Sequence, residues 1–158
     1  MKHLQEASKE LMGHLLFALN HSLDLKRDGV DPMMPFAVVI KGADKGLKTF
    51  VGDTPDYAGQ MFEKTIREEQ PDFVVYAADS YLTVDGTRYD AVLLKAYDKN
   101  DPEIYLVGQK FTPKTATTEF RQLGNPGFLG TVENPHYIPM AITNGNGGKK
   151  PWWKGWRK

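Results

Sequence analysis

Apolar residues recur at helical spacing over the first part of the chain. Between residues 2 and 27 they share one broad face, and acidic side chains lie on the opposite side. The residues expected to face inward are Leu4, Ala7, Leu11, Met12, Leu15, Ala18, Leu19 and Leu23. Gly29 follows as a natural stop. The pattern predicts one long amphipathic helix over residues 2–27.

Shorter apolar runs follow this helix. Residues 35–40 are typical of a buried strand, and a turn over residues 41–46 leads to a second strand over 47–51. Thr54 and Pro55 then form a typical helix start, and Pro71 ends that helix. Its expected inward residues are Tyr57, Ala58, Met61, Phe62, Thr65 and Ile66.

Three antiparallel strands are predicted between residues 72 and 111. Asp85 and Gly86 are the preferred pair for a two-residue turn in which both residues have positive φ, so Val84 should pair with Thr87. A second reversal at residues 99–102 places Asp98 opposite Glu103. Both faces of the resulting sheet are apolar, so each needs a cover, either a helix or another subunit.

Regular pattern fades after Thr112. Turns are predicted at residues 124–127 and 133–136, with a short helix over 117–123. The predicted fold is α+β: a mostly antiparallel sheet of about five strands, flanked by two helices, then an irregular C-terminal arm. We expect one domain over residues 1–143 and a Gly/Asn hinge with a basic tail over 144–158.

The predicted order is helix, strand, strand, helix, strand, strand, strand. Over residues 2–111 this order resembles the roadblock and longin-like group of small α+β domains. The resemblance implies a non-catalytic scaffold that dimerises by joining sheets or packing helices. The long first helix and the lack of a long final helix depart from the group's pattern.

Charge and aromatic residues are distributed unevenly. Residues 149–158 hold all three tryptophans and five of the twenty cations, whereas residues 1–148 hold fifteen cations and twenty acids. Indoles stack on bases and settle at membrane interfaces, and lysines neutralise phosphates. Exposed indoles also favour burial against protein. The predicted docking residues are Trp152, Trp153, Trp156, Lys149, Lys150, Lys154, Arg157 and Lys158.

A polar group is predicted within the sheet. The registers place Asp79 beside Gln109 in one row and Asp90 in the next row of the same face. Asp90 with the triplet Gly108-Gln109-Lys110 resembles the metal-binding core of restriction-endonuclease-like nucleases, although Gly108 stands where that core has an acid. The alternative function is therefore a metal-dependent hydrolase using Asp79, Asp90, Gln109 and Lys110.

Other chemistry has little support in the sequence. The chain has no cysteine, which excludes disulfides and thiolate metal sites and fits a cytoplasmic location. Glu10 and His14 have a usable metal-ligand spacing without an evident third ligand. No nucleotide-binding loop, nucleophile elbow or zinc-protease motif is present, no cofactor is expected, and no run is apolar enough to span a membrane.

The sequence therefore predicts a binding or assembly module, either a homo-oligomer or a subunit of a larger complex. Its tail is the docking element, with protein as the expected partner. Nucleic acid and an anionic membrane surface are the alternatives for the same tail.

Overall fold

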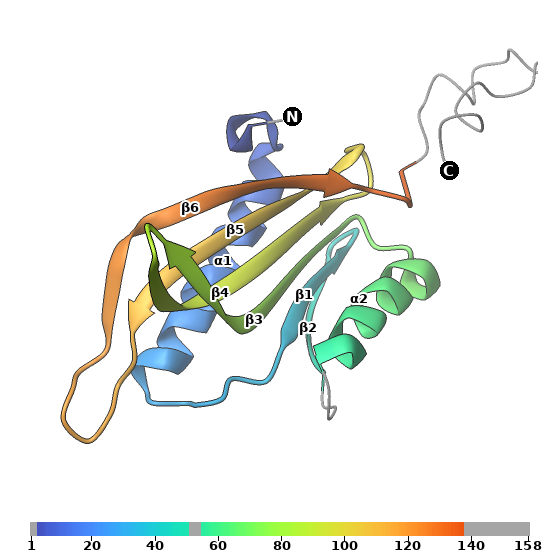
Figure 1. The fold of residues 1–158 in the computed structure, drawn as a ribbon. Helices are drawn as coiled ribbons and strands as arrows, with labels where there is room; N and C mark the ends of the chain where they lie inside the picture. Colours follow the sequence, from blue (N-terminus) through green and yellow to red (C-terminus); the bar gives the residue numbers. More distant parts are fainter. Residues whose placement is uncertain (1–2, 51–54, 138–158) are drawn as a thin grey trace, which may run out of the picture.

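The computed structural model describes residues 3–50 and 55–137. They form two α-helices and an open six-stranded antiparallel sheet with strand order β2-β1-β3-β4-β5-β6 (Figure 1). After a short 3-10 turn at Leu4–Glu6, the elements are α1 (Lys9–Arg27), β1 (Phe36–Lys41), β2 (Asp44–Thr49), α2 (Pro55–Glu69), β3 (Phe73–Val84), β4 (Thr87–Asp98), β5 (Glu103–Thr112) and β6 (Arg121–Glu133). The α+β class and its antiparallel sheet are confirmed, with six strands instead of about five.

Helix α1 begins later than the sequence predicts. Ser8 is the N-cap: its Oγ accepts a hydrogen bond from the backbone N–H of Leu11 at 3.0 Å. Ala7 has an extended backbone that separates the helix from the 3-10 turn. The apolar spacing of Leu4 and Ala7 continues the helical pattern, but the capping hydroxyl sets the boundary.

The predicted hairpin registers are confirmed. Val84 pairs with Thr87, and Asp85 and Gly86 have φ of 50° and 82°, as the two-residue turn requires. The β4–β5 pairing follows the predicted second register, with Ala96 opposite Tyr105. Strand β2 starts three residues before the predicted strand, because the turn from β1 is confined to Gly42 and Ala43.

Strand β6 corrects the prediction for the region after Thr112. The expected helix over residues 117–123 is absent from the described residues, and the expected turn at 124–127 lies inside β6. β6 pairs with β5 through two register shifts, next to Val107 and Gly108. Bulges at a sheet edge tolerate glycine and proline, which is why this sequence forms a strand despite its turn-like composition.

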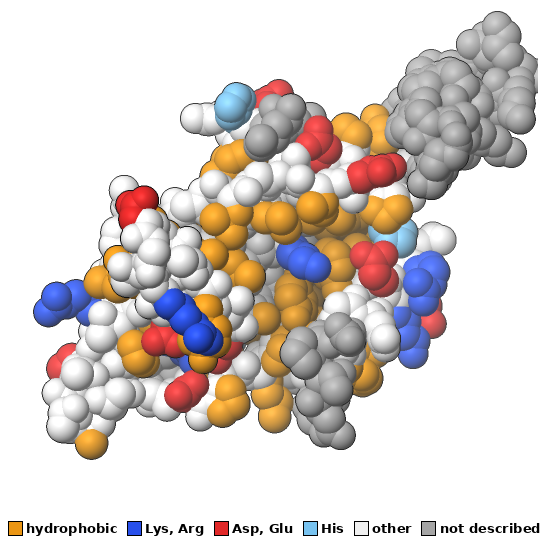
Figure 2. All heavy atoms as spheres, in the orientation of Figure 1, with side chains coloured by type: hydrophobic (Ala, Val, Ile, Leu, Met, Phe, Trp, Pro, Cys, Tyr) orange, Lys and Arg blue, Asp and Glu red, His pale blue; other side chains and the backbone are white. Residues whose placement is uncertain are grey.

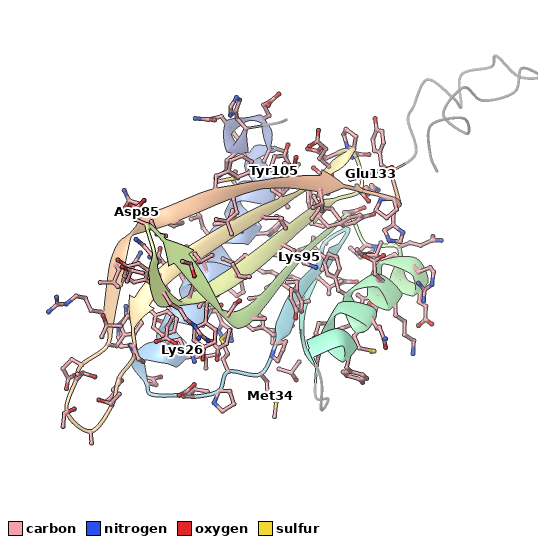
Figure 3. All side chains as sticks on the ribbon, in the orientation of Figure 1. Lys26, Met34, Asp85, Lys95, Tyr105 and Glu133 are labelled. Atoms are coloured by element: carbon pink, nitrogen blue, oxygen red, sulfur yellow. The ribbon has the colours of Figure 1, made fainter. Side chains whose placement is uncertain are left out.

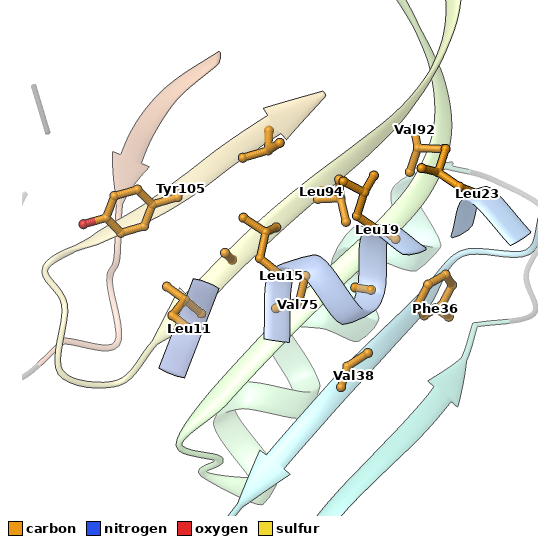
Figure 4. Close-up of a cluster of buried hydrophobic side chains, with 14 of the residues drawn as sticks. Leu11, Leu15, Leu19, Leu23, Phe36, Val38, Val75, Val92, Leu94 and Tyr105 are labelled. Atoms are coloured by element: carbon orange, nitrogen blue, oxygen red, sulfur yellow. The ribbon is translucent and has the colours of Figure 1, made fainter. Parts of the chain in front are cut away.

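Each face of the sheet packs against one helix: α1 packs on one face, and α2 covers part of the other. The face toward α1 carries the larger core, in which Leu11, Leu15 and Leu19 meet Val75, Leu94 and other strand residues (Figure 4). The opposite face, here called the α2 face, packs Ala58, Phe62 and Ile66 of α2 against residues of β1, β3, β4 and β5. Tyr57 was expected to face inward on α2 but is exposed.

Candidate functional site

The polar rows predicted within the sheet are present on the α1 face. Asp79 lies opposite Val92, which lies opposite Gln109, and Tyr81, Asp90 and Phe111 form the next row. Because strand residues alternate between faces, Lys110 belongs to the other side. The register therefore brings Asp79, Asp90 and Gln109 to one face and separates them from Lys110.

Asp79 forms an ion pair with the buried Lys26 of α1. Its Oδ2 atom accepts hydrogen bonds from Lys26 Nζ at 2.8 Å and from the backbone N–H of Met33 at 2.7 Å. Lys26 is only 5% exposed and also donates to the carbonyl oxygen of Val30 at 3.0 Å. The ammonium group lies 5.6 Å from the centre of the Phe111 ring. This ion pair fastens the end of α1 to β3.

A polar pocket of about 200 Å³ opens beside this ion pair. Its lining includes Lys26, Asp31, Asp79, Tyr81 and Asp90. Asp79 Oδ1 is buried and has no hydrogen-bond partner. Asp79 and Asp90 thus share a pocket, but Asp79 already neutralises Lys26. This pairing reduces the capacity of Asp79 to serve as a metal ligand or a general base.

The other two residues of the predicted catalytic group lie elsewhere. Gln109 is fully buried, and its Nε2 donates to the carbonyl oxygens of Lys110, Leu123 and Gly124, so it supports the β5–β6 pairing. Lys110 Nζ lies 4.5 Å from the centre of the Tyr89 ring, on the α2 face. The four side chains do not converge.

The Glu10–His14 pair shows no further ligand. The His14 ring packs 5.0 Å from that of Phe73, and burial, followed by the nearby Lys45, lowers the pKa of His14. Within residues 3–50 and 55–137, no group of three or more His, Cys, Asp or Glu side chains could hold a metal ion. The predicted docking residues, Lys149 to Lys158, lie outside the described residues.

A surface that sequence reasoning did not locate lies on the α2 face. Helix α2 covers only part of this face, and a hollow of about 300 Å³ remains beside it. We call this hollow the leucine trough; its lining includes Tyr76, Ala78, Leu93, Lys95, Leu106 and Leu129, with Gly59 of α2 at its border. Figure 2 shows hydrophobic side chains gathered in this region, and Figure 3 places Lys95 between the sheet and α2. The one signal in the sequence was that both sheet faces are apolar.

Glycine at position 108 shapes the leucine trough. A Cβ atom there would lie 2.8 Å from Leu82 Cδ1, 3.2 Å from Leu129 Cδ1 and 3.4 Å from Leu93 Cδ2. Three leucines from β3, β4 and β6 therefore close over one backbone position of β5. Leu129 nevertheless remains 46% exposed.

Lys95 brings one positive charge into these apolar surroundings. Its Nζ atom lies 5.6 Å from the centre of the Phe62 ring and 5.9 Å from that of Tyr76. Burial raises the pKa of Tyr76, so its hydroxyl stays neutral at physiological pH. The trough is thus apolar, with a cation held among aromatic rings at one side.

Comparisons with known proteins give no relative. No protein-family model matches the chain, and neither curated proteins nor solved structures give a match. Among the described residues, no helix is long and apolar enough to cross a membrane.

Proposed function

We propose that this chain is a non-catalytic binding and assembly module, acting as a homo-oligomer or as a subunit of a larger complex. Its basic aromatic tail, residues 149–158, is the docking element, and it docks on an apolar surface of this same domain, in its own chain or in a copy. The observation that carries the proposal is the leucine trough, an apolar face that α2 leaves open.

The composition of the trough supports a protein contact. Leu93 and Leu106 are half-buried and Leu129 is exposed, so all three retain apolar surface that gains from further burial. Apolar surface rimmed by polar groups marks interaction sites on folded domains, and the centres of protein interfaces are poor in charge. Lys95 and Asp79 are the charged residues of the trough lining, and the Asp79 carboxylate is paired with Lys26.

The tail has matching chemistry. Three indoles provide large apolar surfaces, and tryptophan is the aromatic side chain that a cation such as Lys95 attracts most strongly. The tail carries five cations, whereas residues 1–148 carry twenty acids and fifteen cations, so the two parts of the chain have opposite net charge. The charge difference adds a long-range attraction, which physiological salt screens over about 8 Å.

The test uses a chain ending at Gly148 and a synthetic peptide of residues 149–158. The described residues 3–50 and 55–137 contain the whole sheet and both cores, so the shortened chain keeps every contact described above. Only the peptide contains tryptophan, so its emission reports binding without interference. We expect a saturable shift of emission to shorter wavelength.

Absence of a shift at millimolar protein would contradict the proposal. The same peptide titrated with a single-stranded oligonucleotide and with anionic vesicles tests the other two tail partners. Binding to the oligonucleotide alone, with affinity falling steeply as salt rises, would assign the tail to nucleic acid. Binding to the vesicles alone would assign it to a membrane surface.

A further inference from the structure

We propose that residues 149–158 occupy the leucine trough of their own chain. This inference rests on the proposed function and adds the location of the contact.

The last described residues lie beside the trough. His136 Nε2 lies 2.8 Å from Glu63 Oε1 of α2, and the His136 ring meets the Tyr97 ring edge-on at 6.2 Å. Phe62, the neighbour of Glu63 on α2, packs against Tyr76 of the trough. The chain therefore leaves the described part on the α2 face, next to the helix that borders the trough.

The end of the described chain lies close to the trough: Glu63, which contacts His136, is four residues, about 6 Å along α2, from Gly59 in the trough lining. Eleven residues, 138–148, separate Tyr137 from the first tail cation, Lys149. A random coil of that length has a root-mean-square span of about 18 Å. The tail can thus reach the trough without any rearrangement of the described residues.

This connection favours the chain's own tail over the tail of a second copy. A short linker holds the tail at an effective concentration on the order of millimolar near its own trough, whereas the tail of a second chain is present at micromolar concentrations in solution. If the separate tail peptide binds the trough with a dissociation constant of about 10 μM, the tethered tail would occupy the trough in about 99% of chains. A free tail peptide should consequently bind the full chain about a hundredfold more weakly than the chain ending at Gly148.

The trough provides the contacts that an indole needs. Leu93, Leu106 and Leu129 supply an apolar floor and wall, and Lys95 offers a cation for the ring face. Since the linker brings three tryptophans to one face, at least one can enter the hollow beside α2. In this arrangement the tail cations stay in solvent, on the side of the domain where the Glu63 carboxylate is 43% exposed.

The first experiment measures tryptophan emission of the full chain, in which every tryptophan belongs to the tail. We expect emission at shorter wavelength and weaker acrylamide quenching than for the free peptide. Both should stay constant over about a hundredfold dilution, with a one-chain mass by light scattering. Emission equal to that of the free peptide would overturn the inference, and so would a shift that appears only with a larger mass.

A matched pair of variants locates the contact. Leu129 is 46% exposed in the trough, and Leu16 is 48% exposed on α1. Leu129→Glu should move the emission to the free-peptide value, whereas Leu16→Glu should leave it unchanged. Circular dichroism verifies that both variants fold. Equal responses would place the tail elsewhere.

Engineered cysteines give a second measurement, because the chain has none of its own. Cysteines at positions 129 and 155 (Leu129→Cys with Gly155→Cys) should crosslink within one chain, and the pair Leu16→Cys with Gly155→Cys should not. Crosslinks between two chains would assign the tail to a second copy. If the free peptide binds the shortened chain but these pairs crosslink equally, the inference fails while the proposed function stands.

Discussion

Lys26 Nζ lies 2.8 Å from Asp79 Oδ2, so one ion pair joins the last turn of α1 to the middle of β3. The pair crosses 53 residues of sequence, and both of its residues line the polar pocket. Lys26 is almost fully buried and Asp79 is 27% exposed, so the loss of either charge leaves its partner poorly solvated.

We expect Lys26→Met to destabilise the fold by about 2–3 kcal/mol, because Asp79 then keeps only the Met33 N–H as a donor. Urea unfolding at neutral pH measures the loss. Arg27→Met is the matched control: Arg27 pairs with Asp24 at the exposed surface, and such pairs contribute about 1 kcal/mol or less. Equal losses in the two variants would mean that burial does not strengthen the Lys26–Asp79 pair.

The central hairpins could be predicted from the sequence because local chemistry determines them. Asp85 and Gly86 specify one turn type, and that turn fixes every pair between β3 and β4. Alternation then assigns each residue to a face, including the rows of Asp79 and Asp90. The predicted rows are correct for the same reason.

The sixth strand and the ion pair could not be predicted in the same way. β6 contains Gly124, Asn125, Pro126 and Gly127, which have turn-like propensities, and it is held mainly by backbone pairing to β5 and by the buried amide of Gln109. Lys26 occupies a helix end, where a lysine normally remains in solvent. Its burial depends on the position of β3 under α1, which local patterns do not encode.

Asn134 fastens the end of β6 to the β4–β5 turn. The side chain is 2% exposed, and its Nδ2 donates to the carbonyl oxygens of Asp98 and Asp101 at 3.3 and 2.8 Å. Asn134→Ala should cost about 1–3 kcal/mol, because the Asp101 carbonyl oxygen loses this donor, whereas the Asp98 carbonyl oxygen keeps the N–H of Asp101. Thermal unfolding gives the value. Asn100→Ala, at an exposed position of the same turn, should change stability far less. An equally small change at Asn134 would argue against this role.

Two aspartates near one end of the sheet should give opposite pH dependences. Burial raises the pKa of Asp98 above its ordinary 3.8, against a hydrogen bond from the Asn100 N–H. Hydrogen bonds from Lys99 and from the Gly42 N–H lower the pKa of Asp72. Ionisation of Asp98 therefore lowers the free energy of unfolding as pH rises from 3.8 through its raised pKa. Asp72 contributes stability above pH 3.8 that is lost as pH falls through its lowered pKa.

The measurement compares thermal unfolding of wild type, Asp98→Asn and Asp72→Asn between about pH 2.5 and 7. Relative to wild type, Asp98→Asn should gain stability as pH rises above 3.8, whereas Asp72→Asn should lose stability as pH rises toward 3.8 and change no further above it. Parallel curves for the two variants would contradict the opposite environments of these carboxyl groups.

Lys95 decides whether the trough selects an indole or any apolar side chain. Lys95→Met keeps the length of the side chain and removes its charge, so a cation–π contact of about 0.5–1 kcal/mol is lost. We expect the peptide of residues 149–158 to bind the chain ending at Gly148 about two- to fivefold more weakly, and Lys95→Arg to restore the affinity. Lys45→Met is the control, since Lys45 lies 3.6 Å from the centre of the Phe17 ring, outside the trough lining.

The opposing effect is repulsion between Lys95 and the cations of the tail. Those charges stay in solvent, where a separation of about 10 Å at physiological salt already screens most of their interaction. An indole in contact with the ammonium group is not screened in this way, so attraction should prevail. If Lys95→Met instead binds the peptide more tightly, and tightest at low salt, repulsion dominates. The trough would then recognise apolar area alone.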